Sequence, residues 1–382
     1  MKILVIKMSS IGDLIHTFPA IVDAKLHIKD LTIDWMVDED FLEIISIYKN
    51  FNNLQAIDQI ISIPLRKIKR NILKELIKFN LKNFLNHLRT VEYDLIIDPQ
   101  GLLKSALLAK LAKTKNIVGF DINSCREKFA SFLYQNKITV NKDLHAIFRT
   151  KKLFANSLNY PYQEDISKIN YGLDLKSFKN LTKFIPETLF NHKKYIVLLH
   201  GTSWESKHWS IDYWNQLSKL IIADNISIVI FANDIKQQQF AEQLLTFLNN
   251  TLDNNESNNY KNKIIILSKL NFSNIIVILA NALGVVAVDT GFAHLAASIG
   301  VPIVGIYGPT SINRSGVLGN KSLNLQSNYP CSPCYSRICL KYYNGQSQVK
   351  QPCFLELTPN IVFEQLKRLI TKNQIYITTS VI

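Results

Sequence analysis

In the first half of the chain, short apolar runs alternate with segments in which apolar residues recur at helical spacing. The runs predict strands at Lys2–Met8, Thr32–Val37, Asp94–Asp98 and Asn116–Phe120. The segments between them predict helices that begin at Ile15 and Phe41 and helices that cover Lys69–Leu88 and Leu102–Ala112. Strands that alternate with helices are typical of a doubly wound α/β fold with a parallel sheet.

The same alternation begins again after a polar stretch in the middle of the chain. Strands are predicted at Tyr195–His200, Ile226–Phe231, Ile264–Leu267, Gly284–Val288 and Pro302–Tyr307. Helices are predicted from Ile211 and over Lys236–Leu248, Asn271–Leu283, Phe292–Ile299 and Pro359–Ile370. The asparagine-rich stretch Asn249–Asn262 predicts a polar surface loop. We therefore expect a first domain over 1–170, a linker over 171–194, a second domain over 195–358 and a terminal helical region over 359–382.

Length and charge narrow the class of protein. A chain of 382 residues exceeds one typical domain, which supports the division into two. The net charge of +14 predicts an anionic partner: a nucleic acid, a phosphorylated sugar or an acidic membrane surface. No nucleic-acid motif is present, so we expect no nucleic-acid partner. The longest apolar region, Ile275–Val288, is short for a bilayer span, and no secretory signal is visible. We expect a cytoplasmic protein with peripheral membrane association.

The first predicted strand leads into a small-residue turn, Ser9–Gly12, which is followed by Asp13. Strand, turn and helix in this order open a nucleotide- or sugar-binding half-domain. The turn lacks the GxGxxG and GxxxxGK[ST] patterns, which excludes the usual dinucleotide and P-loop sites. A lone carboxylate at the end of this strand is a candidate general base. Capping of the helix by Asp13 is an equal alternative.

Two further turns after predicted strands carry groups suited to phosphate. Gly201–Ser203 followed by Lys207 offers hydroxyls, backbone amides and an ammonium at a helix start. Asp289–Gly291 with His294 again opens a helix, and the glycine permits close approach of the backbone. Each turn alone is equally well explained as an ordinary capped helix with a solvent-facing lysine or a core-facing histidine. Together they favour a nucleotide diphosphate site in the second half.

A basic run, Arg66–Arg70, lies at the boundary between a predicted loop and a helix of the first half. A solvated helix face is the favoured explanation for such a run. The functional alternative is that these basic residues bind an acidic acceptor. Arg126 and Arg149 are weaker candidates for this role, and Lys104 follows the Asp98–Gly101 turn toward the same end of the sheet.

Four of the five cysteines cluster late in the chain, at Cys331, Cys334, Cys339 and Cys353. A cytoplasmic location argues against a disulfide. The first two cysteines have zinc-ligand spacing, but the spacing of the other two is irregular for a zinc site. We therefore favour four reduced thiols over a structural zinc, and we expect no metal and no obligatory cofactor.

Several segments in combination resemble a known family: VIKMSSIGDLIHTFPA at the start, the DPQGLLKSAL turn, the KHW motif, and VVAVDTGFAHLAASIGVPIVGIYGPT. They are similar to the bacterial lipopolysaccharide heptosyltransferases of glycosyltransferase family 9, and most similar to the type I branch. The resemblance runs from Met1 to about Asn328. It implies the GT-B architecture, with two Rossmann-like domains facing each other across a cleft. The first would bind the acceptor and the second the nucleotide sugar, and the terminal helix would pack back toward the first.

The resemblance also implies an activity: inverting transfer of heptose from ADP-heptose to Kdo of Kdo-lipid A, in the synthesis of the lipopolysaccharide inner core. The catalytic residues would be Asp13, as general base, and Lys207. The donor-binding residues would be Thr202, Ser203, Lys207, Asp289, Thr290, Gly291 and His294. The acceptor-binding residues would be Ser10, Gly12, Arg66, Lys67, Lys69, Arg70, Gln100, Lys104 and Arg126. We expect a monomer on the cytoplasmic face of the inner membrane.

Two segments depart from the type I pattern and leave alternatives open. Ala232–Ile235 stands where the pattern has an aromatic-glycine pair, and Gln237 stands near its acidic residue. Contacts to the adenosine are therefore expected to differ. The cysteine-rich tail CSPCYSRICL resembles the type II branch. One alternative is thus a type II or III enzyme that acts on a heptosylated acceptor, and another is a noncatalytic lipopolysaccharide-assembly protein with the same fold.

Overall fold

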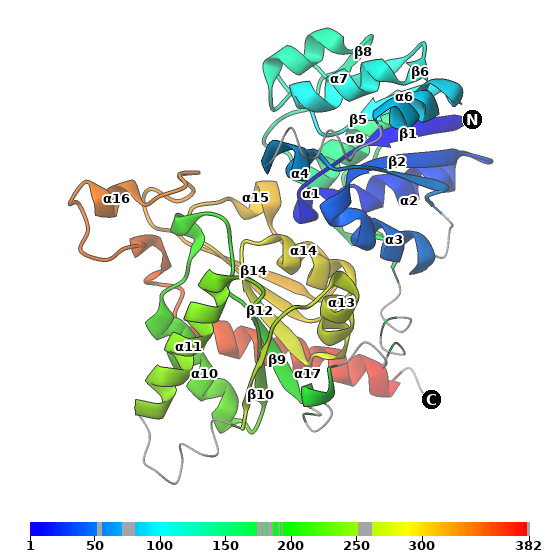
Figure 1. The fold of residues 1–382 in the computed structure, drawn as a ribbon. Coiled ribbons are helices and arrows are strands. Elements are labelled where there is room, and N and C mark those ends of the chain that lie inside the picture. Colours follow the sequence, from blue (N-terminus) through cyan, green and yellow to red (C-terminus); the bar gives the residue numbers. More distant parts are fainter. Residues whose placement is uncertain are drawn as a thin grey trace. The chain divides into compact units, whose positions relative to one another are not determined.

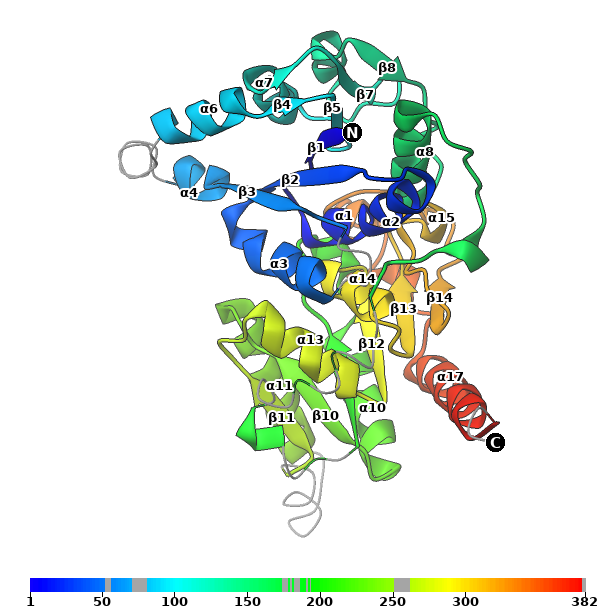
Figure 2. The same ribbon diagram turned by 90° about the vertical axis from the view of Figure 1, so that its right-hand side faces the viewer.

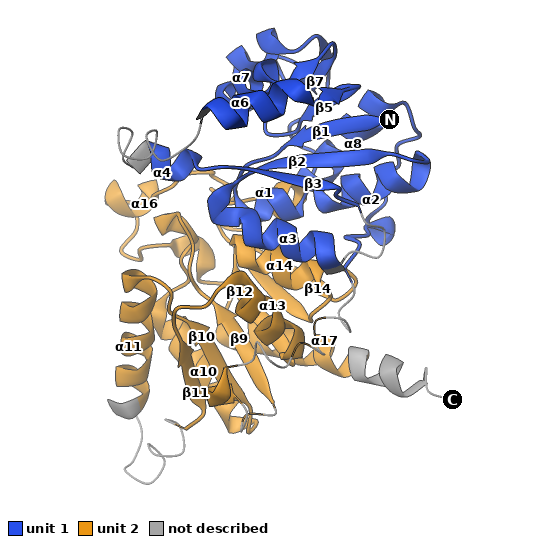
Figure 3. Ribbon diagram, turned by 45° about the vertical axis from the view of Figure 1, so that its right-hand side comes forward, with its two compact units in different colours: residues 1–173 blue, residues 174–382 orange. Residues whose placement is uncertain are grey.

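The chain folds into two compact units, Met1–Leu173 and Asp174–Ile382, which Figure 3 colours separately. The structure is a computed structural model of the chain. It describes residues 1–51, 56–70, 81–173, 178, 181, 186–189, 192, 194–250 and 262–379. Each unit contains its own six-stranded sheet, in agreement with the repeated alternation in the sequence.

The sheet of the first unit is parallel throughout and has the order β3-β2-β1-β5-β7-β8 (Figure 1). Its strands are β1 (Lys2–Ile6), β2 (Thr32–Asp38), β3 (Gln59–Ile63), β5 (Leu95–Asp98), β7 (Ile117–Phe120) and β8 (Asn136–Ile138). The short strands β4 (Glu92–Tyr93) and β6 (Lys113–Thr114) form a separate pair. The helices include α1 (Ile11–Ile15), α2 (Phe18–His27), α3 (Leu42–Phe51), α4 (Leu65–Arg70), α6 (Leu81–Thr90), α7 (Leu103–Leu111) and α8 (Ala146–Leu158), with 3₁₀ turns η1 (Glu39–Phe41), η2 (Lys128–Leu133) and η3 (Ile166–Lys168).

The second unit repeats this arrangement, with a parallel sheet in the order β11-β10-β9-β12-β13-β14. Its strands are β9 (Tyr195–Leu199), β10 (Ser227–Phe231), β11 (Ile264–Leu267), β12 (Gly284–Val288), β13 (Ile303–Tyr307) and β14 (Ser322–Gln326). Its helices include α10 (Ile211–Ala223), α11 (Ile235–Asn250), α13 (Phe272–Asn281), α14 (Gly291–Ser298), α15 (Ile312–Ser315), α16 (Leu340–Tyr343) and α17 (Pro359–Thr379), with 3₁₀ turns η5 (Glu187–Leu189), η6 (Glu205–Lys207) and η7 (Pro352–Phe354). In both units the first strand lies inside the sheet, which is the order of a doubly wound nucleotide-binding domain.

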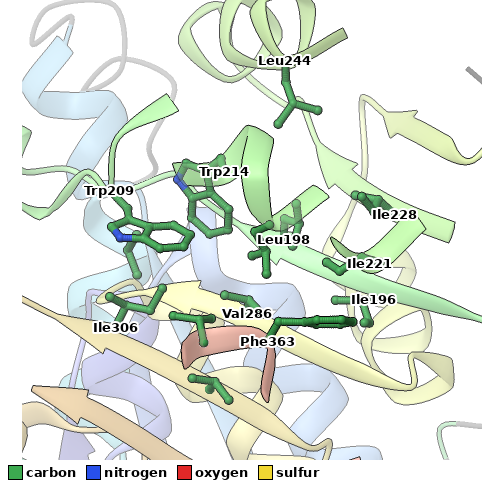
Figure 4. Close-up of a cluster of buried hydrophobic side chains, with 14 of the residues drawn as sticks. Ile196, Leu198, Trp209, Trp214, Ile221, Ile228, Leu244, Val286, Ile306 and Phe363 are labelled. Atoms are coloured by element: carbon green, nitrogen blue, oxygen red, sulfur yellow. The ribbon is translucent and has the colours of Figure 1, made fainter. Parts of the chain in front are cut away.

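The central strands of the second unit are buried on both faces. On one face Leu198 and Val286 belong to a core that includes Trp214 of α10 and Phe363 of α17 (Figure 4). The adjacent Val197 is equally buried and points to the opposite face. Helix α14 covers that face at β12 and β13 (Figure 2). Burial on both faces explains why these strands read as unbroken apolar runs in the sequence.

Helix α17 packs against its own unit, on α10 and on strands β12, β13 and β14. Gly284 allows this close approach, because a Cβ atom there would lie 2.9 Å from Leu366 Cδ1. Just before the helix, the Leu357 carbonyl accepts a hydrogen bond from Trp209 Nε1 at 3.1 Å. The return of the terminal region toward the first unit remains a prediction.

The structure corrects one helix and adds elements that the sequence pattern did not predict. The helix expected to begin at Ile15 is wrong, because α1 ends at that residue and α2 begins at Phe18. Pro19 lies in the first turn of the second helix and has no N–H to continue the first. Strands β3, β8 and β14 and helix α8 were not predicted. Of the expected helix over Lys69–Leu88, the structure describes the two ends, which belong to α4 and α6. Residues 71–80 in its middle lie outside the described residues. The same is true of residues 251–261 in the predicted surface loop and of much of the predicted linker.

Candidate active site

Each sheet has one switch point, where successive crossovers leave the central strands in opposite directions. It lies between β1 and β5 in the first unit and between β9 and β12 in the second. Ligands of doubly wound domains bind at the carboxyl ends of these strands. Predicted site residues follow each of these strands: Asp13 follows β1, Gln100 follows β5, Lys207 follows β9 and Asp289 follows β12.

The carboxylate of Asp13 caps α1 and still keeps one oxygen for other partners. Its Oδ2 accepts hydrogen bonds from the backbone N–H and the hydroxyl of Ser10, both at 3.1 Å. Its Oδ1 lies 3.9 Å from Lys7 Nζ, and its side chain is 35% exposed. Gly12 is buried in the same helix and adds no side chain beside the carboxylate. Capping and proton transfer would therefore use different oxygens of one group.

Lys7 is a buried cation beside Asp13 that the sequence reasoning missed. Its Nζ donates to the Pro99 carbonyl at 3.0 Å. Burial lowers the pKa of Lys7, although the negative charge of Asp13 opposes this shift. Burial would also raise the pKa of Asp13, but the charges of Lys7 and Arg126 and the hydrogen bonds of the cap hold it below its ordinary value. Asp13 is therefore ionised at neutral pH. A lysine that ends an apolar strand is the signal that could have found Lys7.

Gln100, predicted to bind the acceptor, fixes the loop that leads to Asp13. Its Oε1 accepts from the Met8 N–H and its Nε2 donates to the Ser9 carbonyl, both at 2.9 Å. Its own turn is held by Asp98, whose Oδ1 accepts from the Gln100 N–H at 2.9 Å. Gly101 completes the turn with a φ of +64°, a conformation that favours glycine. The buried amide thus ties together the two strands at the switch point.

Two members of the basic run are paired with acids of their own unit. Lys67 Nζ lies 2.5 Å from Glu39 Oε1, and Arg66 Nη1 lies 3.9 Å from Asp40 Oδ2. Both basic side chains are about half exposed, so an anionic acceptor would compete with these pairs. The other two predicted members, Lys69 and Arg70, have side chains outside the described part of the structure.

The remaining predicted acceptor residues differ in their relation to Asp13. Arg126 is exposed, and its charge lowers the pKa of Asp13 as described above. Lys104 lies on the exposed face of α7, and no contact described for it reaches Asp13. Arg149 donates from Nη2 to the Ser124 carbonyl at 2.7 Å. Arg126 is therefore the cation of this group that the structure brings to the carboxylate.

Asp289 is the centre of the predicted donor site in the second unit. Its Oδ2 lies 2.7 Å from Lys207 Nζ and accepts a hydrogen bond from Thr310 Oγ1, also at 2.7 Å. Both members of the ion pair are largely buried. Lys207 Nζ also lies 4.4 Å from the centre of the Trp204 ring, where the face of the ring attracts a cation. These contacts hold an ammonium group at the carboxyl end of the sheet.

The other predicted donor residues flank this ion pair. Thr202 Oγ1 donates to the backbone carbonyl of Asp289 at 3.1 Å, which joins the loop after β9 to the loop after β12. His294 is buried in α14, with Nε2 4.0 Å from Asp289 Oδ1. The remaining members are Thr290 and Gly291 at the start of α14 and the exposed Ser203 on the turn after β9.

Two further residues border the donor loops. Thr310, which the sequence reasoning missed, follows strand β13, and its position after a strand is the signal that could have found it. Gln237 covers the turn after β9, because a Cβ atom on Gly201 would lie 3.0 Å from Gln237 Nε2. Its Oε1 accepts from the Asn233 N–H at 3.0 Å. The type I pattern has an acidic residue near this position, whereas this chain places the amide of Gln237 against the turn after β9.

The cysteine-rich tail carries free thiols. Burial, reinforced by the neighbouring thiols, raises the pKa of Cys353 to about 12. Within the described ranges, no group of three or more His, Cys, Asp or Glu side chains is arranged to hold a metal ion. None of the helices in the described part of the chain has the length and apolar character needed to cross a bilayer.

The two sites together define a class of protein. One Rossmann-like domain presents an ionised carboxylate at its switch point, and the other presents a buried lysine beside the start of α14. An acceptor hydroxyl needs a base, and a departing nucleoside diphosphate needs positive charge. Two Rossmann-like domains with these groups are the parts of a GT-B glycosyltransferase that uses a nucleotide sugar.

Comparisons with known proteins give the family. Residues 82–343 match glycosyltransferase family 9 (heptosyltransferase). Lipopolysaccharide heptosyltransferase 1 of Pseudomonas aeruginosa is 33% identical over 377 residues, which cover 97% of this chain and 98% of that protein. The structure of E. coli heptosyltransferase WaaC with ADP has a TM-score of 0.75 and 28% identity, covering 97% of this chain and 100% of that one. The structure of E. coli heptosyltransferase WaaC with ADP-2-deoxy-2-fluoro heptose has a TM-score of 0.69 and 29% identity, and the match covers 91% of this chain and 100% of that one. This chain belongs to glycosyltransferase family 9. The predicted family, enzyme class and GT-B fold are confirmed.

Proposed function

We propose that the protein is an inverting heptosyltransferase of lipopolysaccharide inner-core synthesis, which transfers heptose from ADP-heptose to Kdo of Kdo-lipid A. The observation that carries this proposal is that the two oxygens of the Asp13 carboxylate have different partners. One accepts the hydrogen bonds of the helix cap, and the other lies 3.9 Å from Lys7 Nζ. The similarity to a Pseudomonas aeruginosa protein named lipopolysaccharide heptosyltransferase 1 supports the sugar and the pathway. The similarity to E. coli structures with ADP and with an ADP-heptose analogue supports the donor.

Asp13 acts as general base in a single displacement. The acceptor hydroxyl gives its proton to Oδ1 while its oxygen forms a bond to the anomeric carbon. The bond from that carbon to the diphosphate oxygen breaks on the opposite face, so the configuration inverts and ADP leaves. Lys7 and the cap keep Asp13 ionised before the reaction.

Lys207 stabilises the negative charge that develops on departing ADP. The ammonium is already positioned by Asp289 at 2.7 Å and by the face of the Trp204 ring. Ser203 and the start of α14, at Thr290 and Gly291, supply hydroxyl and N–H donors around the diphosphate, and the hydrogen bond of Thr202 to the Asp289 carbonyl holds their two loops together. Because Lys207 supplies positive charge from a side chain, we expect the reaction to proceed without a metal ion.

The acceptor meets positively charged side chains of the first unit. Arg126 and the exposed side of Arg66 and Lys67 attract the carboxylate of Kdo and the phosphates of lipid A. Because the acceptor is a lipid, we place the reaction at the cytoplasmic face of the inner membrane, and we propose a monomer as the working form.

The proposal is tested by incubating the protein with ADP-heptose and, in parallel, with Kdo-lipid A or a heptosylated acceptor. Mass spectrometry of the lipid and measurement of released ADP report transfer. We expect one added heptose on Kdo-lipid A and little on the second acceptor. Preferential transfer to the heptosylated acceptor would assign a type II or III activity instead. Tight binding of ADP-heptose without transfer to either acceptor would indicate a noncatalytic protein.

A further inference from the structure

An apolar patch on the surface of the first unit is not used by the site described above. It consists of three leucines on α7 and two phenylalanines on η2. The exposed fractions are 41% for Leu103, 51% for Leu107, 38% for Leu111, 71% for Phe129 and 64% for Phe132. These five residues are called the α7–η2 patch below. Helix α7 is labelled in Figure 1.

The leucines of the patch form one stripe along the outer face of α7. They are spaced four residues apart, which places them on the same side of a helix. The opposite side, with Ala106 and Ala109, is fully buried against the unit. A surface helix ordinarily turns polar residues outward. The stripe therefore exposes apolar surface that the core of the unit does not require.

The phenylalanines are held in place beside this stripe. Turn η2 packs against α7, and the Glu127 carboxylate just before it accepts from the Leu103 N–H at 2.7 Å. Ala130, between the two aromatic residues, is fully buried. The rings of Phe129 and Phe132 have centres 6.3 Å apart. A packed turn thus directs both rings to the surface.

Four lysines border the apolar surface. Lys104 and Lys110 lie on the two edges of the leucine stripe, as the helical spacing places them. Lys128 is exposed next to Phe129, and Lys137 Nζ lies 5.9 Å from the centre of the Phe132 ring. Glu127 is the acidic residue within this border, and its carboxylate is bound to the backbone of α7.

We propose that the α7–η2 patch is the surface by which the protein binds an anionic phospholipid membrane. Phenylalanine and leucine enter the boundary between headgroups and acyl chains, while lysine side chains bind lipid phosphates at the rim. Charge complementarity favours a lipid surface over a second copy of this chain, because two copies would bring the lysine borders together. The biological purpose rests on the proposed function, since a lipid-linked acceptor resides in the membrane. Helix α7 follows the turn whose Gln100 fixes the loop leading to Asp13, so the first residue of the patch, Leu103, lies toward the end of the sheet that carries the proposed base.

Co-sedimentation of the full chain with vesicles tests this surface. Vesicles of phosphatidylglycerol and phosphatidylcholine are compared with vesicles of phosphatidylcholine alone. We expect binding to the anionic vesicles, and at least about a tenfold lower partition for the double variant F129S/F132S, since each buried Phe contributes on this scale. K128E/K137E should also bind less. The matched control is Ile235→Ser, which changes a 72% exposed isoleucine of the second unit and should bind like the unchanged protein.

Two results would overturn the proposal. One is wild-type partition of F129S/F132S and of a second variant, L107S, into the anionic vesicles. The other is a lipid-free dimer, seen by light scattering, that F129S/F132S abolishes, because the patch would then be covered by a second copy. Transfer assays separate this surface from the proposed activity. F129S/F132S should lose transfer to acceptor embedded in vesicles and keep transfer to a water-soluble, deacylated acceptor. If the unchanged protein binds vesicles through the patch but transfers no heptose, the proposed function fails and the membrane surface stands.

Discussion

Replacement of Lys7 by methionine should move the acidic limb of the pH–rate profile to higher pH. Lys7 Nζ lies 3.9 Å from Asp13 Oδ1. At that separation two unit charges attract by about 1 kcal/mol in water and about 4 kcal/mol at an effective dielectric constant of about 20. The smaller value applies, because the Asp13 side chain is 35% exposed and water screens it. About 1 kcal/mol corresponds to about 0.7 of a pKa unit.

The sign of this shift follows from the opposing effects on Asp13. Burial raises the pKa of its carboxyl group, whereas Lys7, the cap and Arg126 together lower it below the ordinary value. Without Lys7 the effect of burial is opposed less, and the pKa rises. The base works only when ionised, so transfer decreases as the pH falls through this pKa. In Lys7→Met that decrease begins at a higher pH.

The assay is kcat/KM for transfer, measured from about pH 2.5 to pH 8, because the limb of the unchanged protein lies below the ordinary aspartate pKa of about 3.9. Lys29→Met is the matched control, because Lys29 is exposed in the same unit and its removal should leave the profile unchanged. A structural defect alone would lower the rate at every pH without moving the limb. An unmoved limb in folded Lys7→Met protein would refute the coupling of Lys7 to Asp13.

Three other predictions follow from single contacts. Thr310→Val removes the 2.7 Å hydrogen bond to Asp289 Oδ2 and should raise the KM for ADP-heptose by about tenfold, the worth of one hydrogen bond to a charged group, with Thr310→Ser restoring it. Gly284→Ala places a Cβ atom 2.9 Å from Leu366 Cδ1 and should lower the free energy of unfolding by about 1–3 kcal/mol in denaturant titrations. Burial lowers the pKa of His200 from 6.5 to about 4, so between these values the unfolded chain binds the proton first. The free energy of unfolding should therefore decrease as the pH falls through this window, and the decrease should be smaller in His200→Leu. An equal dependence of the unfolding free energy on pH in both proteins would show that His200 is not the group responsible.

The sequence pattern found the central strands and missed most edge strands for one physical reason. A central strand of a parallel sheet is buried on both faces, so β9 and β12 are continuous apolar runs. Strands β3, β8 and β14 lie at sheet edges and keep polar residues, as in the Ser322–Gln326 segment, whose residues are all only partly buried. Edge strand β11, with the sequence IIIL, was predicted because it is apolar.

For the candidate sites too, the sequence predicted residues that are placed by local structure and missed contacts that depend on the folded chain. Asp289 follows its strand directly, and Asp13 lies in the first turn of the helix that follows β1, so the sequence alone places both at the ends of the sheets. The pairing of Lys67 with Glu39 joins residues far apart in the chain, and no spacing rule indicates it. Lys7 ends an apolar strand, which is a signal in the sequence, but its pairing with Asp13 is known only once the loop is folded.

Single-turnover transfer by Asp13→Asn tests the role of Asp13 most directly. Asparagine keeps the shape of the side chain and cannot accept the proton from the acceptor. The matched control is Asp30→Asn, at an exposed position of the same unit. We expect the rate of heptose transfer from ADP-heptose to Kdo-lipid A to decrease by about 10²–10⁴-fold in Asp13→Asn, with ADP binding and the control unchanged. Transfer by Asp13→Asn at the wild-type rate would contradict the assignment of Asp13 as the general base.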